Sequence, residues 1–288
     1  MASGAVPKDK SVEKVIWLED IYNYLYTQKG EEAPPRIHIP STVMLKYQRP
    51  CAWFTSSAEG ELIKRYDTKD LDPHVIKKQF WYCLLAPYLP HCPCRLTRDL
   101  TPCFLGSETS VPRKHDCVAY YVSYAKGAKG QRTAKIEYFD DKGLENFFLN
   151  RPKENNGIVQ KFEDPTSPYN TLLRAYWTPH KLQLQQRCNR HELGDTRLVM
   201  NDRLSTFDGP EHLNVEFEIK SYKLKTRLTE CVTSIVEHIK MLLPSAYTLW
   251  TMECFFKLSG KNKLLFLWCN DLRVFNTNGR RTLHLGLL

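Results

Sequence analysis

The sequence lacks the short motifs that mark the common enzyme classes. It contains no G-x-x-x-x-G-K-[ST] phosphate loop, no G-x-S-x-G nucleophile motif, no G-x-G-x-x-G and no kinase-like set of motifs. It also lacks an apolar run of the ~18 residues that a membrane span needs, and its first residues lack the apolar core of a secretory signal. We therefore expect no enzymatic activity, no cofactor and no membrane partner.

The missing export signal also decides how the cysteines are interpreted. The chain has ten cysteines. Without a secretory route they are predicted to be reduced thiols in a cytosolic compartment, and most are expected to be small buried side chains.

Negative charge is the scarcer sign. Lys and Arg number 41 against 32 Asp and Glu, which gives a net charge of +9. A basic chain favours an acidic partner, which could be a nucleic acid, an anionic membrane or an acidic protein surface. A soluble basic protein without a charged partner is the alternative.

The fold class predicted from periodicity is α+β. In the N-terminal region, residues 1–149, helices are expected over 12–26 and from Pro73 to about 85, separated by irregular proline-rich segments. A β-hairpin is expected at about 117–139, with a glycine-containing loop.

Residues 150–224 show little sustained periodicity, and five prolines interrupt them. Their aromatic side chains, Trp177 and Phe207 among them, argue against simple disorder. We expect an extended strap that folds against the chain itself or against a neighbour.

The C-terminal region, residues 225–288, is predicted to be a compact unit of one helix followed by a hairpin. An apolar stripe marks a helix over 226–243, which Pro244 ends, and two aromatic-rich strands follow it. Ile235 and Trp268 are expected to be largely buried.

One irregular stretch gathers side chains that could hold a metal. The candidate ligands are His91, Cys92, Cys94, Cys103, His115 and Cys117. Thiolates and imidazoles suit tetrahedral zinc. The spacing is poor, because Cys92 and Cys94 form C-x-C instead of C-x-x-C and no second pair follows. Ordinary thiols and surface histidines are favoured, with zinc as the alternative.

A second polar cluster lies within the expected strap. Cys188 and His191 could form a nucleophile and base pair, but charged residues flank them, and the sequence around His191 lacks the second histidine of H-E-x-x-H. A polar contact surface is the favoured interpretation.

The order of several motifs in the second half resembles a known family. "GIVQKFEDP", "NTLLRAYWTPH", "QQRCNRHELGD", "RLSTFDGPEHL", "VTSIVEHI" and "LLFLWCNDLRVF" follow one another. This order is similar to a poorly characterised family of cilia- and flagella-associated proteins of flagellated eukaryotes. The resemblance covers about residues 144–276.

The resemblance implies a non-enzymatic structural component of the flagellar axoneme, within the cytoskeleton. Its expected partners are tubulin, whose surface is acidic, and other axonemal proteins. The residues expected to contact them are Trp177, Arg187, Arg190, Arg197, Phe207, Gly209, Pro210 and His212. Two alternatives stay open: a basic subunit of a large ribonucleoprotein such as a mitochondrial ribosome, and a zinc-binding protein.

Overall fold

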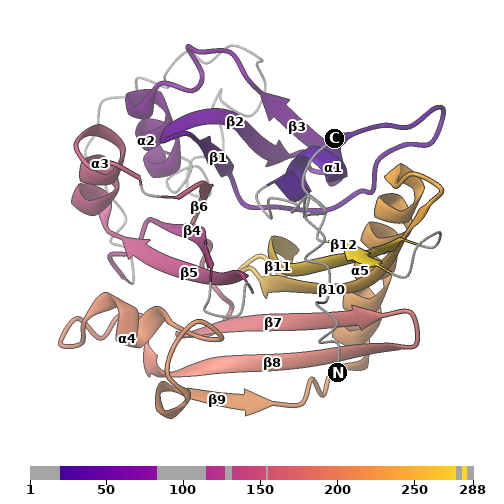
Figure 1. Ribbon diagram of the computed structural model, residues 1–288. Coiled ribbons are helices and arrows are strands. Elements are labelled where there is room, and N and C mark those ends of the chain that lie inside the picture. The colour runs from indigo at the N-terminus through magenta and orange to yellow at the C-terminus, as the bar shows by residue number, and fades with distance from the viewer. Residues whose placement is uncertain (1–19, 83–114, 127–131, 154, 277–280, 284–288) are drawn as a thin grey trace, which may run out of the picture.

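The computed structural model describes residues 20–82, 115–126, 132–153, 155–276 and 281–283. The strands form two six-stranded antiparallel sheets, which lie one above the other in Figure 1. One hydrophobic cluster joins both sheets, and a second lies on the outer face of the first sheet.

The first sheet has the strand order β3-β2-β1-β6-β4-β5. Its strands are β1 (Thr42–Lys46), β2 (Arg49–Ser56), β3 (Leu62–Arg65), β4 (Ala119–Lys126), β5 (Arg132–Phe139) and β6 (Gly157–Lys161). Helices α2 (Pro73–Tyr82) and α3 (Asp141–Leu149) cover its outer face, where Trp53 meets Phe80 edge to face at 6.2 Å. Both faces of this sheet are therefore packed.

The second sheet has the strand order β12-β11-β10-β7-β8-β9. Its strands are β7 (Tyr169–Thr178), β8 (Lys181–Glu192), β9 (Asn214–Phe217), β10 (Tyr247–Leu258), β11 (Leu264–Asn276) and β12 (Arg281–Leu283). Helix α5 (Tyr222–Leu242) packs against β7 and β10 with a buried stripe that includes Leu228, Val232, Ile235 and Ile239. None of the described helices is long and apolar enough to cross a membrane.

The two sheets are held together by hydrogen bonds and ring contacts between β4, β5 and β11. Tyr124 Oη donates to the carbonyl of Cys269 at 2.9 Å, and the backbone N–H of Ala134 donates to Asn270 Oδ1 at 3.1 Å. The space between the sheets is thus a buried interface that contains polar groups as well as apolar ones.

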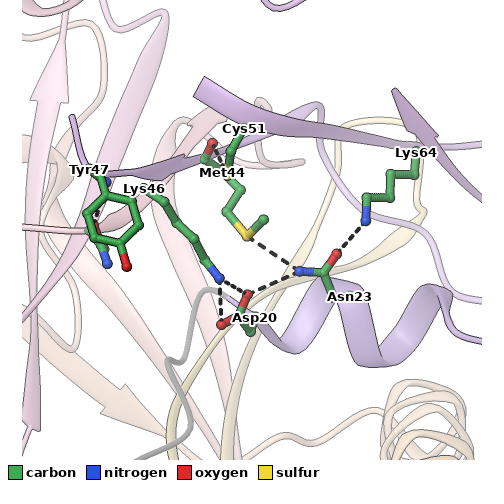
Figure 2. A network of polar contacts seen from close by, with 8 residues as sticks. Asp20, Asn23, Met44, Lys46, Tyr47, Cys51 and Lys64 are labelled. Carbon is green, nitrogen blue, oxygen red and sulfur yellow. Dashed lines mark hydrogen bonds and ion pairs between the residues drawn. The ribbon is translucent and has the colours of Figure 1, made fainter. Parts of the chain in front are cut away.

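A polar network anchors the short helix α1 (Ile21–Tyr26) to the first sheet (Figure 2). Asp20 is fully buried and forms an ion pair with Lys46 at 2.7 Å. Asn23 donates to Asp20 at 3.1 Å and accepts from Lys64 Nζ at 2.8 Å. Because each buried polar group has a partner, the helix can lie on the inner face of the sheet without an uncompensated charge.

The predicted α+β class is confirmed, and so are several of its elements. The predicted central hairpin is β4 and β5, the predicted C-terminal helix is α5, and the strands after it are β10 and β11. Ile235 and Trp268 are 0% and 3% exposed, as expected. Of the helix predicted over 12–26, residues 12–19 lie outside the described part of the chain.

Residues 150–224 differ from the extended strap that the sequence predicts. They contain β6, β7, β8, helix α4 (Met200–Leu204), a 3₁₀ turn (Glu211–Leu213) and β9. Strand β8 is rich in Gln and Arg and has no β-branched residue, so its sequence is weakly typical of a strand. Because β7 pairs with β10, the C-terminal hairpin and the expected strap share one sheet.

Candidate functional site

The residues predicted to contact a partner lie on β7, on β8 and in the turns that follow β8. The structure brings together Arg187 and Phe207, with the Arg187 guanidinium carbon 4.7 Å from the ring centre. Arg174 lies 5.3 Å from the same ring centre, and the ring packs edge to face on Phe255 at 5.4 Å. Phe207 is therefore held by its own chain.

The other predicted contact residues on these strands also have partners within the chain. Lys240 Nζ lies 4.8 Å from the ring centre of Trp177, and Arg187 forms an ion pair with Glu216 at 2.9 Å. Arg190 Nε donates to the carbonyl of Asn214 at 3.3 Å. Internal partners thus account for these side chains without a neighbouring protein.

Arg197 is different, because its side chain is 88% exposed. It donates two hydrogen bonds to Asp195, at 2.8 and 2.9 Å, and these lower the pKa of Asp195 to about 2. This pair is a local contact at the surface between residues two positions apart.

The tight turn after α4 explains Gly209. A Cβ atom at Gly209 would lie 2.3 Å from Ser205 Oγ and 2.4 Å from Ser205 Cβ, which is too close for any side chain. The carbonyl of Pro210 accepts from Asn214 Nδ2 at 2.9 Å, and His212 is exposed in the 3₁₀ turn. Gly209 and Pro210 therefore shape the turn.

Only two of the predicted metal ligands lie in the described part of the chain. His115 Nε2 is 2.7 Å from Asp164 Oδ1, and Cys117 is buried with a pKa that burial raises well above its ordinary value. His91, Cys92, Cys94 and Cys103 lie outside the described residues. Within the described part, no group of three or more His, Cys, Asp or Glu side chains could hold a metal ion. The zinc alternative stays a prediction.

A buried lysine on β10 is the most unusual group that the described residues contain. Lys257 is 3% exposed, and its Nζ donates to Asn170 Oδ1 at 2.8 Å and lies 3.8 Å from the ring centre of Phe162. No carboxylate of the described residues forms an ion pair with it. Burial lowers the pKa of Lys257 from 10.5 to about 7, although nearby Cys117, Asp164 and Glu163 oppose that shift.

A small cavity of about 10 Å³ lies beside Lys257, between the two sheets. It is lined by Tyr120, Tyr138, Phe162, Asn170, Leu172, Lys257, Leu267 and Trp268. This is room for one guest the size of a water molecule. The rings of Tyr120 and Trp268 come from different sheets and meet edge to face at 5.8 Å.

The unpartnered polar atoms of this lining are donors. Trp268 Nε1 is buried and has no hydrogen-bond partner among the described residues. Lys257 has one acceptor there, Asn170 Oδ1, so its other protons are free. The Asn170 amide accepts from Lys257 through Oδ1 and donates one Nδ2 proton to the carbonyl of Leu204. A guest in the cavity can therefore accept hydrogen bonds from Lys257 and Trp268.

The carbonyl of Leu204, at the end of α4, connects the turn containing Phe207 to this cavity. It accepts from Asn170, and Tyr138 Oη lies 3.3 Å from it. Tyr138 Oη is also 3.1 Å from Asp208 Oδ2, and burial raises the pKa of that carboxyl. In Figure 1, α4 lies at the end of β7 and β8, and it contacts both strands.

Sequence reasoning missed Lys257, Asn170, Tyr120 and Tyr138. Lys257 and Asn170 are 87 positions apart, and no motif relates them. One signal was present: a single lysine interrupts the apolar run Cys-Phe-Phe-Lys-Leu of a strand that reads as buried. A charge at such a position is rare in a structural core, where lysine is almost never fully buried unless it is paired.

Comparison with known proteins gives distant structural similarities only. No protein-family model and no curated protein sequence matches this chain. The macrocyclase MdnC of Microcystis aeruginosa MRC, bound with the precursor peptide MdnA, has 10% identity and a TM-score of 0.35 over 81% of this chain and 49% of its own. A type-2 SAICAR synthetase in complex with ADP has 11% identity and a TM-score of 0.29, over 57% of this chain and 80% of its own.

The VanG D-Ala:D-Ser ligase of Enterococcus faecalis has 9% identity and a TM-score of 0.30, over 85% of this chain and 49% of its own. The chain spans about half the length of this ligase and of the macrocyclase. At these TM-scores the similarities assign no reaction and no ligand to the chain.

The neighbours nevertheless correct the functional expectation. The expectation of a non-enzymatic structural component of the flagellar axoneme is contradicted by this comparison, in which the similar solved structures are enzymes. The resemblance to cilia- and flagella-associated proteins, the tubulin partner and the axonemal localisation have no test here and stay predictions from the sequence.

Proposed function

We propose that this chain is a nucleotide-dependent enzyme that binds a purine nucleotide between its two sheets, beside Lys257. The observation that carries the proposal is the cavity lining, which offers aromatic walls and unpartnered donors. A purine base matches both features, because its flat ring stacks on aromatic side chains and its ring nitrogens accept hydrogen bonds.

The cavity has to widen before a nucleotide can enter. A space of about 10 Å³ holds no purine, so the rings of Tyr120 and Trp268 must separate. These rings belong to different sheets, so they would part if one sheet moved relative to the other. The structure then corresponds to the closed, ligand-free state, and the nucleotide would select a more open one.

Lys257 gives the site its polarity. An acceptor on the nucleotide would accept a hydrogen bond from Lys257 Nζ, and this bond would favour the charged form of the amine. Binding should therefore be accompanied by proton uptake near neutral pH. This proton uptake distinguishes nucleotide binding beside Lys257 from nucleotide binding elsewhere on the basic surface.

The test is calorimetric titration of the full-length chain with ADP and ATP in buffers of different ionisation enthalpy. We expect binding with proton uptake in the wild type and loss of both in Lys257→Met. Lys261→Met is the matched control, since Lys261 is exposed in the turn between β10, which carries Lys257, and β11. Phosphate release from ATP, measured with candidate acceptor substrates, tests turnover.

The proposal is overturned if neither nucleotide binds at millimolar concentration. It is also overturned if Lys257→Met, with a wild-type melting profile, binds ADP as the wild type does. Nucleotide binding without any turnover would rule out the enzymatic part of the proposal, and the chain would then be a nucleotide-binding protein.

A further inference from the structure

We propose that the ligand-free protein holds one small inorganic anion, of the size of chloride, in the cavity beside Lys257 and Trp268. The proposal goes beyond nucleotide binding. It shares the cavity with the proposed nucleotide site, but it requires no nucleotide and no movement of the sheets.

The first reason is charge. A buried ammonium group is unfavourable unless a negative charge or strong acceptors surround it. The Nζ of Lys257 has one neutral acceptor, Asn170 Oδ1, and no ion pair among the described residues. The carboxylates of Asp164 and Glu163 act only from a distance, and the Asp164 side chain is 64% exposed. An anion beside Nζ supplies the missing compensation.

The second reason is geometry. The cavity has about the volume of one water-sized guest, and nearly all of its lining residues are buried. Trp268 lines it, is 3% exposed, and has a buried Nε1 without a partner among the described residues. Two donors, one of them able to carry a positive charge, suit a monatomic anion better than a molecule that must donate hydrogen bonds in return.

The groups around the cavity do not supply a competing charge. Tyr120 and Tyr138 face it from β4 and β5, and burial raises both phenol pKa values, so both are neutral at physiological pH. Cys117 is likewise kept as a thiol by burial. Leu267 and Trp268 on β11 and Asn170 on β7 carry no charge. Asp208 is separated from the cavity by the Tyr138 hydroxyl.

The experiment compares thermal unfolding of the full-length chain in chloride and in gluconate at equal ionic strength. Because the anion binds the charged amine, we expect chloride to raise Tm by a few degrees at about pH 6.5, saturably, and much less at about pH 8.5. Bromide should act in the same way. In crystals soaked with bromide, an anomalous peak should lie in this cavity.

Three variants make the test specific. Lys257→Met and Trp268→Phe should lose the chloride response, whereas Lys261→Met should keep it. If Lys257→Met does not fold, Trp268→Phe still decides, because it preserves an aromatic ring and removes only the indole donor and one ring. Equal Tm in chloride and gluconate for the wild type, or a full chloride response in Trp268→Phe, would overturn the anion site.

The outcomes separate this site from the nucleotide proposal. A chloride response that depends on Lys257, without any ADP binding, supports the anion site and rules out the nucleotide proposal. ADP binding without a chloride response supports the nucleotide proposal and rules out the anion site. If both ligands bind, they share donors, so the apparent affinity for ADP should fall as chloride replaces gluconate.

Discussion

The charge state of Lys257 makes the stability of the protein depend on pH in a direction that can be worked out. The folded-state pKa of about 7 lies below the ordinary value of 10.5. Below pH 7 the amine is charged in both the folded and the unfolded chain, so the full cost of burying the charge is present. Above pH 7 the folded chain releases the proton while the unfolded chain retains it. Stability should therefore rise with pH until about pH 10.

The size of this effect follows from the same values. Each full pH unit between the two pKa values contributes about 1.4 kcal/mol. Because the folded chain is already half deprotonated at pH 7, the free energy of unfolding should increase by roughly 2 kcal/mol from pH 7 to pH 9. Lys257 is 3% exposed, and solvent screening therefore reduces this figure little. Bound chloride would shrink the increase, because it stabilises the charged amine.

The assay is urea unfolding in gluconate buffer at several pH values, for the wild type, Lys257→Met and Lys261→Met. Other groups titrate in this range, so the informative quantity is the difference between wild type and variant. We expect the rise to be present in Lys261→Met and absent in Lys257→Met. If Lys257→Met keeps the same pH dependence as the wild type, the buried amine does not titrate near neutral pH and the reasoning fails.

Substitutions at three further positions, two of them with a matched control, test the packing of the chain. Gly209→Ala should destabilise the chain by about 1–3 kcal/mol, because the new Cβ would overlap Ser205. Gly260→Ala is the control: its Cβ would meet nothing nearer than 3.6 Å, so the urea midpoint should change little. Ile235→Ala should cost ~2–5 kcal/mol and Ile235→Val ~0.5–1.5 kcal/mol in the same assay, since this side chain is fully buried on the inner face of α5; equal effects would place it outside the core. Arg203→Met should cost roughly 1–3 kcal/mol, because Arg203 is 1% exposed and donates to a backbone carbonyl and to Asp116, whose 45% exposed side chain stays solvated without its partner; a melting temperature like that of the wild type would show that these contacts contribute no net stability.

The elements that the sequence predicted well are those whose pattern is local and strong. Helix α5 carries an apolar stripe at helical spacing with a serine at its N-cap, Ser221, whose Oγ accepts from Leu224 N at 3.3 Å. Strands β10 and β11 are aromatic-rich and flank a short turn. In each case neighbouring residues contain the signal, so tertiary contacts only strengthen what local sequence already favours.

The polar face of the second sheet explains why the sequence alone predicts an extended strap where β7 and β8 lie. Leu184 packs against the core, but its neighbours Gln183 and Gln185 face solvent or other polar groups. Such alternation without Val or Ile is weak evidence for a strand. The pairing of β7 with β10 stabilises this part of the sheet. That pairing joins residues about 80 positions apart, which no local pattern can reveal.

The candidate site was missed for a related reason. Its parts come from β4, β5, β7, β10, β11 and the segment after β6, and each contributes one or two residues. Sequence motifs identify sites that one loop or helix contains, as phosphate loops and zinc knuckles do. A site assembled between two sheets leaves in the sequence only single residues that do not fit their surroundings, such as Lys257.

The turn that contains Phe207 and Asp208 is connected to this site by hydrogen bonds. Leu204 O is shared by Asn170, the partner of Lys257, and by Tyr138, which also contacts Asp208. If the sheets separate to admit a ligand, the Tyr138 hydroxyl must leave Leu204 and Asp208 or α4 must move with β5. In the first case the buried Asp208 carboxyl loses a donor; in the second, the Asn170 amide is pulled away from Lys257. Either way, opening the cavity changes the hydrogen bonding of Lys257 or Asp208, so the charge of these groups and the position of α4 are coupled.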